Sequence, residues 1–137
     1  MKICVCCSLS FTDEVLALAE ELERRGHELL LPNSVVKRLI KRADFDPVKT
    51  KVETDAVRKH IDKIRKADAV LICNYDKKGI ANYIGANTFI EIAAAHYHRK
   101  PIYTLNPLPD QQYINDEIQS FNIKPLNGDL SLLGADA

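Results

Sequence analysis

The sequence has no excess of either charge, because 19 lysine and arginine residues balance 19 aspartate and glutamate residues over 137 positions. A neutral chain has no basic field to gather nucleic acid or an anionic membrane. We therefore expect small-molecule ligands and protein partners, with no nucleic acid and no membrane. Internal repeats and low-complexity tracts are also absent. The length fits a single domain that spans residues 1–137.

Long apolar runs are missing as well. The N-terminal stretch MKICVCC has one lysine and then a short apolar run that soon meets Thr12, Asp13 and Glu14. Such a run is too brief for a signal peptide or a membrane span. We expect a soluble cytoplasmic protein.

The cysteine pattern lacks the spacing of a metal or redox site. Cys4, Cys6 and Cys7 share one apolar run, and neither they nor Cys73 has a C-x-x-C partner. We interpret all four as core thiols of buried strands in a reducing compartment. No metal and no cofactor are expected.

Strands and helices alternate along the chain. Short apolar runs predict strands at Lys2–Cys7, His27–Leu31, Ala69–Tyr75, Pro101–Leu105 and Ile123–Leu126. Helical spacing predicts a helix from a Thr12 cap to Gly26, and others at Val35–Ala43, Glu53–Ala67, Thr88–Arg99 and Asp110–Phe121. The helix at Glu53–Ala67 repeats apolar residues at Val57, Ile61, Ile64 and Ala67. Asp44–Lys51 reads as a loop, and the last residues read as a loosely held tail.

This alternation indicates an α/β fold with an open parallel five-stranded sheet and helices on both faces, in flavodoxin-like or Rossmann-like order. Ligands of such folds sit outside the carboxyl ends of the strands. The site is therefore expected in the loops Ser8–Thr12, Asn74–Thr88 and Asn106–Pro109.

The stretch GANTFIE, residues 85–91, has two interpretations. Thr88 and Glu91 have the S/T-x-x-E spacing of a capping box, in which each side chain satisfies one backbone donor at a helix start. A carboxylate in the ligand crevice can instead attack the anomeric carbon of a sugar. The spacing by itself leaves both open.

Four segments in register resemble the nucleoside 2-deoxyribosyltransferase-like superfamily, which includes 2'-deoxynucleoside 5'-monophosphate N-glycosidases. They are VCCSLSF, IRKADAVLICN, GANTFIE and RKPIY, and the match covers roughly residues 2 to 106. The ending, LNPLPDQQYINDEI followed by KPLNGDL, resembles a small branch apart from the established transferases.

The resemblance implies that Glu91 is the nucleophile in retaining cleavage of an N-glycosidic bond. The first loop, chiefly Ser8 and Ser10, would then hold the 5' end of the sugar. The substrate-binding candidates are Ser8, Ser10, Phe11, Asn74, Asp76, Gly85, Asn87 and Thr88.

The sequence departs from the family pattern at several positions. Gly85 stands where transferases carry an aspartate and the monophosphate N-glycosidases a serine, so Asn87 or Asp76 would have to replace that group. Ser10 stands where phosphate-binding members place an arginine. These departures disfavour a monophosphate ligand.

His60 is a second catalytic candidate, because an imidazole titrates near neutrality and can protonate a leaving base. The plainer interpretation is a half-exposed histidine between Lys59 and Lys63 on a helix. His96 and His98 lie two residues apart on a helix and therefore on different faces, which disfavours a shared metal.

Other functions remain open. The main alternative is a nucleoside- or nucleotide-binding regulatory module on the same fold, which Gly85 favours. A relation to the cytokinin-activating phosphoribohydrolases ranks third, because their longer double-glycine signature is missing from YIGANT. By analogy with the superfamily we expect a homodimer or larger homo-oligomer, with Asn106–Phe121 at the contact.

Overall fold

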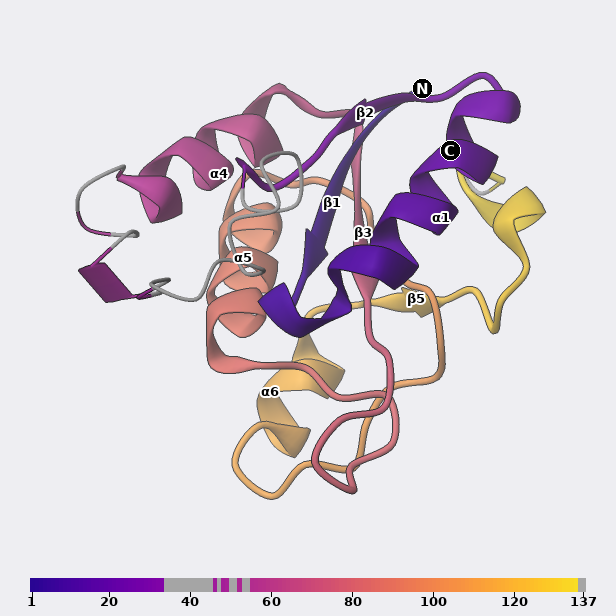
Figure 1. Cartoon of the computed structure of the whole chain (residues 1–137). Helices are drawn as coiled ribbons and strands as arrows, with labels where there is room; N and C mark the ends of the chain where they lie inside the picture. The colour runs from indigo at the N-terminus through magenta and orange to yellow at the C-terminus, as the bar shows by residue number, and fades with distance from the viewer. Residues whose placement is uncertain (34–45, 47, 50–51, 53–54, 136–137) are drawn as a thin grey trace.

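Five parallel strands form one sheet in the computed structural model of the chain (Figure 1). The structure describes residues 1–33, 46, 48–49, 52 and 55–135. The strands are β1 (Lys2–Cys7), β2 (Glu28–Leu30), β3 (Ala69–Cys73), β4 (Ile102–Thr104) and β5 (Lys124–Pro125). Their order is β2-β1-β3-β4-β5, and each neighbouring pair is parallel. This is the flavodoxin-like order. The predicted fold class is confirmed.

The strands β1 and β3 form the centre of the sheet. They pair in register from Ile3 opposite Ala69 to Cys7 opposite Cys73. Helices cover both faces of these strands, which explains why KICVCC and AVLIC are almost continuously apolar. β3 ends at Cys73, before the expected Tyr75.

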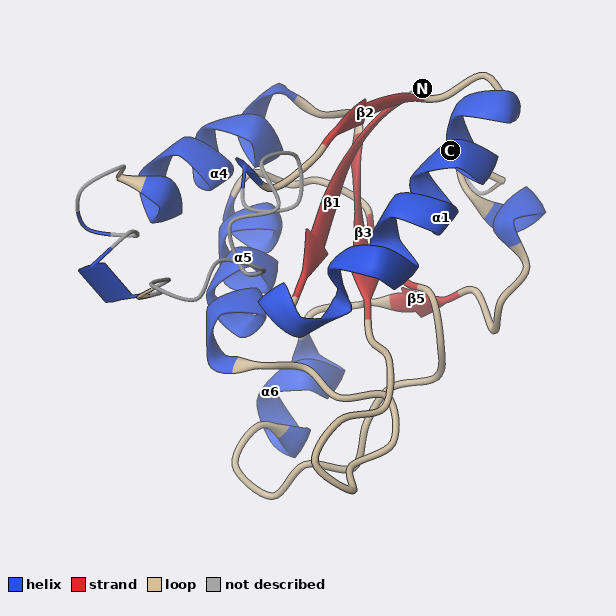
Figure 2. Ribbon diagram, viewed as in Figure 1, coloured by secondary structure: helices blue, strands red, loops and turns tan. Residues whose placement is uncertain are grey.

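Alternate residues of β1 enter two separate cores, one on each face of the sheet. The helix α1 (Thr12–Arg24) covers one face, and α4 (Ala56–Lys66), α5 (Ala86–Tyr97) and α6 (Asn115–Ser120) cover the other (Figure 2). The α1-side core includes Ile3, Val5, Cys7, Val15, Leu22, Leu71 and Cys73. The α4–α5-side core includes Cys4, Cys6, Ile64, Val70, Ile72, Ile92 and Ile118.

Helix α1 starts without the cap that the sequence suggested. A 3-10 turn, η1 (Leu9–Phe11), precedes it, and Phe11 occupies the N-cap position without a side-chain hydrogen bond. Thr12 is the buried first residue of the helix, so its predicted capping role is wrong. Gly26 follows the helix with a φ of 90°, which a glycine adopts at low cost.

Helix α4 presents a different face to the sheet than its apolar residues suggested. Ile64 and Ala67 are buried as expected, but Val57 is 39% exposed. His60 takes the inward place and is only 7% exposed. The interpretation of His60 as a half-exposed surface histidine is therefore wrong.

Two expected elements fall in the part of the chain that the structure leaves undescribed. The helix at Val35–Ala43 lies outside the described residues, and so does most of the loop at Asp44–Lys51. Within the described part, none of the helices combines the length and apolar character needed to cross a bilayer.

The helix α6 is shorter than expected. It begins at Asn115 rather than Asp110, because the preceding residues form a hydrogen-bonded turn. In that turn the side chain of Asn115 accepts a bond from the backbone N–H of Gln111 at 2.8 Å and donates one to Asp110.

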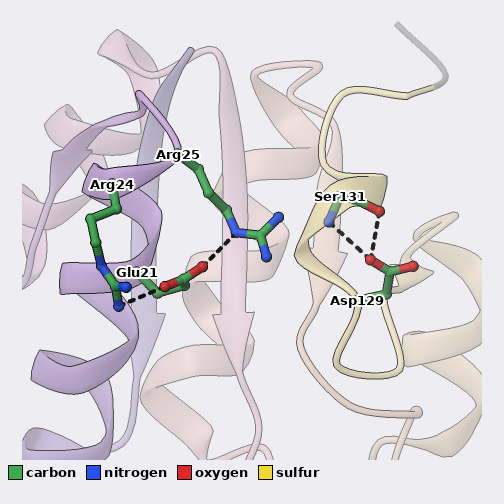
Figure 3. Close-up of polar contacts among 5 residues, drawn as sticks. All are labelled: Glu21, Arg24, Arg25, Asp129 and Ser131. Carbon is green, nitrogen blue, oxygen red and sulfur yellow. Dashed lines mark hydrogen bonds and ion pairs between the residues drawn. The ribbon is translucent and has the colours of Figure 1, made fainter.

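The C-terminal segment is packed against the α1-side core, so its prediction as a loose tail is wrong. Leu130 is buried there, and the N–H of Gly134 donates to the Tyr103 hydroxyl at 3.1 Å. Asp129 accepts bonds from the backbone and hydroxyl of Ser131 at the start of η3 (Leu130–Leu132), and these bonds lower the pKa of Asp129. Figure 3 shows this turn near the end of α1, where Glu21 pairs with Arg24 and Arg25.

Candidate active site

His60 and Glu91, the two catalytic candidates, meet between α4 and α5. The Nε2 atom of His60 lies 2.9 Å from Oε2 of Glu91. Glu91 is 5% exposed, so nearly all of its surface is withdrawn from water. A buried carboxylate needs a hydrogen-bonding or charged partner, and His60 is that partner.

Glu91 is not part of a capping box. Helix α5 begins at Ala86, with Gly85 as its N-cap, and the Gly85 carbonyl accepts the N–H of Phe89 at 2.9 Å. Thr88 therefore lies inside the first turn, and Glu91 lies in the second turn. The capping-box interpretation is wrong, because the backbone becomes helical two residues before Thr88.

Two cysteines complete the surroundings of His60. Cys4 and Cys6 alternate along β1 and therefore point to the same face of the sheet. Their Sγ atoms lie 3.6 Å and 3.3 Å from Nε2 of His60. The C-x-C spacing on a strand indicated that the two thiols share a face, but it did not indicate that His60 faces them.

Burial and mutual contact shift the titration of this cluster. Burial acts to lower the pKa of His60, but hydrogen bonds with Cys4 and Glu91, helped by the charge of Glu91, raise it to about 10. The hydrogen bond with Cys6 contributes most to lowering the pKa of Cys4 to about 6, against the effect of burial. Contacts within the cluster therefore outweigh the effect of burial on the pKa of His60 and of Cys4.

The pKa values of the other three thiols are raised, including that of Cys6, which also contacts His60. Burial raises the pKa of Cys7 to about 12 and that of Cys73 well above its usual value. Burial also raises the pKa of Cys6. All four cysteines are buried and free, so their placement as core thiols is confirmed.

The first loop and the loop after β3 approach each other at Ser8. Its hydroxyl lies 3.1 Å from the Ser10 hydroxyl and accepts a bond from Nζ of Lys77 at 3.0 Å. Lys77 also lies 5.4 Å from the ring centroid of Tyr83. Lys77 is not among the candidates selected from the sequence, so the structure adds it to this loop cluster.

Phe11 and Asn74 have structural partners. The Phe11 ring is buried and packs edge-on against Tyr75, with 5.1 Å between ring centroids. Asn74 is fully buried, and its amide bonds the backbone of Asn106 and Pro107 at 2.9–3.2 Å. Asn74 therefore fastens the end of β3 to the loop after β4.

The remaining candidates lie on the loop and the helix start before Glu91. Asp76 accepts the backbone N–H of Asn82 at 2.9 Å and closes a turn. Gly85 caps α5 by its backbone, Asn87 is half-buried in the first turn, and Thr88 is buried. This group does not contact the His60–Glu91 pair through any of these bonds.

A groove of about 410 Å³ lies at the amino end of β4, among Arg99, Lys100, Tyr103, Phe121 and Lys124. None of the predicted site residues lines it. His96, at its rim, packs on Phe121, whereas His98 stacks on Tyr97. The expected separation of these two histidines is confirmed.

The comparisons with known proteins address the fold. No family model matches the chain, and no curated protein matches it either. Among solved structures, a 2-deoxyribosyltransferase from Bacillus psychrosaccharolyticus is similar, with a TM-score of 0.56, 20% identity, 88% of this chain covered and 81% of that chain. The CMP N-glycosidase BcmB from Clostridium botulinum is similar with a TM-score of 0.55, 16% identity, 99% of this chain covered and 98% of that chain.

The chain shares the fold of these two solved structures. The resemblance that four sequence segments suggested is confirmed at the level of the fold, over nearly the whole chain.

Proposed function

We propose that the protein cleaves or transfers the N-glycosidic bond of a deoxynucleoside, nucleoside or nucleotide, with Glu91 as the nucleophile. The observation that carries the proposal is the pairing of Glu91 with His60, from two neighbouring helices, over the carboxyl half of β1. Solved structures of the same fold include a 2-deoxyribosyltransferase and a CMP N-glycosidase, which supports this reaction class.

The reaction proceeds in two displacements. An oxygen of the Glu91 carboxylate bonds to the anomeric carbon of the sugar, and the bond from that carbon to the base nitrogen breaks. The base leaves with the electron pair and takes up a proton. Water or a second base then attacks the same carbon and frees the carboxylate, so the configuration at the anomeric carbon is retained.

His60 acts on Glu91 in this proposal. Its Nε2 atom is 2.9 Å from the carboxylate and is enclosed by the thiols of Cys4 and Cys6. A contact of this kind fixes the orientation of a nucleophile and stabilises its charge. The direct delivery of a proton to the leaving base, expected from the sequence, is less well supported by this arrangement. His60 is therefore proposed as a positioning residue.

The loop cluster of Ser8, Ser10 and Lys77 is the proposed contact for the 5' end of the sugar. Two hydroxyls and one ammonium group lie within 3.1 Å of their neighbours and can bind a hydroxyl or an anionic group. The ammonium of Lys77 offsets the lack of an arginine at Ser10. Asn74 is proposed to hold the adjoining loop in place rather than to touch the substrate.

The alternative is a non-catalytic module that binds a nucleoside or nucleotide. Two observations favour it: the 5% exposure of Glu91 and the missing side chain at Gly85. A buried, paired carboxylate can be a structural ion pair alone. The two functions differ in one respect, since only an enzyme releases free base.

Glu91→Gln tests the proposal. Incubation with deoxyribonucleosides, ribonucleosides and their 5'-monophosphates, followed by chromatography of free base, should show release by the unchanged protein. The variant should be slower by at least ~10³-fold, because an amide cannot form the ester intermediate. Glu20→Gln, on the exposed side of α1, is the matched control and should keep full activity.

The outcomes separate the functions. Equal release by both Glu91→Gln and the unchanged protein removes Glu91 from the mechanism. Calorimetric binding of a panel member without release supports the module. If no member of the panel is bound or cleaved, both functions are contradicted. Circular dichroism checks that the variant remains folded.

A homodimer or larger homo-oligomer remains part of the proposal, with the segment 106–121 at the contact. Tyr113 in this segment is 88% exposed, and a contact between subunits there would bury its ring. Light scattering on the purified protein measures the assembly, and a monomer at all concentrations would contradict it.

A further inference from the structure

The buried cluster on the α4–α5 side of β1 contains side chains that could bind a metal ion. The Sγ atoms of Cys4 and Cys6 and a ring nitrogen of His60 all lie within 4.8 Å of one another. Glu91 reaches the same ring nitrogen from α5. We infer that Cys4, Cys6 and His60 bind one thiophilic divalent ion, with Zn²⁺ the best match, and that Glu91 supplies the fourth ligand.

The distances fit a tetrahedral shell. With Zn–S of about 2.3 Å and Zn–N of about 2.0–2.1 Å, ligand sulfur and nitrogen atoms lie about 3.6 Å apart. The observed separations from His60 Nε2 are 3.6 Å to Cys4 and 3.3 Å to Cys6. The Glu91 oxygen lies 2.9 Å from the same nitrogen but outside the group of atoms that are all within 4.8 Å of one another, so Glu91 must move toward the sulfurs to become the fourth ligand.

Hydrogen bonds cannot account for all the polar neighbours of the His60 ring nitrogen. A single ring nitrogen carries either one proton or one lone pair, so it makes one good hydrogen bond. Nε2 of His60 nevertheless has three polar neighbours, two sulfurs and a carboxylate oxygen, within 3.6 Å. A cation placed between the two sulfurs and this nitrogen contacts all three at once.

The ligand set selects the class of ion. Thiolates are soft ligands, and two thiolates with an imidazole and a carboxylate match Zn²⁺ better than Mg²⁺ or Ca²⁺, which prefer oxygen. The ligands bind as two thiolates and a neutral imidazole, so the protons that Cys4, Cys6 and His60 carry before binding are released to water. The assembled site then carries a net charge of −1 from Zn²⁺, two thiolates and one carboxylate.

The opposite face of the sheet provides an internal control. Cys7 and Cys73 are paired in register on neighbouring strands and belong to the α1-side core. Among the described residues, His60 and Glu91 are the only buried histidine and carboxylate, and both belong to the cluster on the other face of β1. Two close thiols without further ligands do not make a tetrahedral site.

A consequence follows that rests on the proposed function. Glu91 bound to a metal has its lone pair engaged and cannot attack a sugar. Zn²⁺ at this cluster should therefore suppress base release, and a chelator should restore it. Metal binding itself is measured without substrate, so it can succeed or fail whatever the fate of the glycosidic reaction.

The test is a Co²⁺ titration of the reduced, chelator-treated full chain, with optical absorption as the readout. Thiolate-to-cobalt charge transfer gives a near-ultraviolet band, which we expect to saturate at one ion per chain and to disappear when Zn²⁺ is added. Cys6→Ser should abolish the band or weaken Co²⁺ binding by at least ~10-fold, in the range seen when a metal site is damaged. Cys73→Ala, the matched control, should leave it unchanged.

Absence of the band, or a band that persists at full strength in Cys6→Ser, would overturn the inference. X-ray absorption on the unchanged protein loaded with Zn²⁺ keeps the test decisive even if a variant misfolds. It should find two sulfur ligands at about 2.3 Å and two nitrogen or oxygen ligands at about 2.0–2.1 Å. A shell of oxygen ligands alone would contradict the site.

Discussion

The two faces of β1 carry the same residue type in different chemical settings. On one face Cys7 lies with Cys73 under α1, among apolar side chains. On the other face Cys4 and Cys6 surround His60, which binds Glu91. The pKa of Cys7 rises to about 12 through burial, whereas that of Cys4 falls to about 6. Burial also raises the pKa of Cys6, which lies 3.3 Å from His60, so the histidine side of β1 holds one thiol of each kind.

The comparison also separates stability from function. The α1-side core gains from burying apolar surface and, among the described residues, has no buried histidine or carboxylate to desolvate. The α4–α5-side core buries a histidine and a carboxylate, whose desolvation costs free energy that their contact must offset. A cost of this kind is expected where a fold carries a reactive site.

The largest stability effect is expected from breaking the buried pair. His60→Leu leaves Glu91 without its partner inside the core, which should lower the free energy of unfolding by about 3–5 kcal/mol. Urea unfolding in the presence of reductant and chelator measures it. The double variant His60→Leu with Glu91→Leu removes both polar groups and should lose clearly less. A single-variant loss below about 1 kcal/mol would show that the pair is not buried as described.

The next largest stability effect is expected at Asn74, which directly follows β3. Asn74→Ala removes the amide that holds Asn106 and Pro107 and leaves buried backbone groups unpaired, so unfolding should become easier by about 2–3 kcal/mol. Chemical denaturation provides the value. The matched control is Gln119→Ala on the exposed side of α6, where a change within about 0.5 kcal/mol is expected. Equal losses in the two variants would count against the fastening role.

The thiols sharpen the contrast between the faces. Cys73→Ala and Cys6→Ala each leave a small cavity and should each lower stability by about 1–2 kcal/mol. Only Cys6→Ala should also slow base release, by roughly tenfold, because it loosens the position of His60 and hence of Glu91. Parallel assays of stability and turnover check this. A loss of turnover in Cys73→Ala as large as that in Cys6→Ala would remove the distinction.

The smallest effect is expected at Gly85. An added Cβ there would lie 3.4 Å from the Tyr83 ring, an ordinary contact, and φ is −78°. Gly85→Ser should therefore raise stability by only a few tenths of a kcal/mol through helix capping. Gly26→Ser, where φ is +90°, should lower it by about 1 kcal/mol. Thermal unfolding compares the two, and a larger loss at Gly85 would show that the position is crowded.

Much of the fold was predictable from particular runs of sequence. The continuous apolar runs of β1 and β3 indicated central parallel strands, and the alternation of strands and helices indicated the sheet order. The start of α5 was not predictable, because Thr88 and Gly85 are both acceptable N-caps and only the backbone path selects Gly85. Helical spacing extends over the whole of 110–121, but only Asn115–Ser120 forms a helix.

The site was predictable only in part. Glu91 and His60 were each selected from the sequence, but their contact depends on the rotation of α4 about its axis. Apolar spacing placed Val57 inward, whereas the structure buries His60 against Cys4, Cys6 and Glu91. A polar group that is buried with partners 31 to 56 residues away leaves no periodic signal in the sequence.

The claim that Glu91 forms a covalent bond to the sugar can be measured directly. The protein is mixed with an excess of the best substrate from the panel, quenched in acid during turnover, digested and analysed by mass spectrometry. The account predicts a glycosyl adduct on Glu91, none in Glu91→Gln, and retention of configuration at the anomeric carbon of the product. Release of base with inverted configuration and no adduct on Glu91 would contradict it.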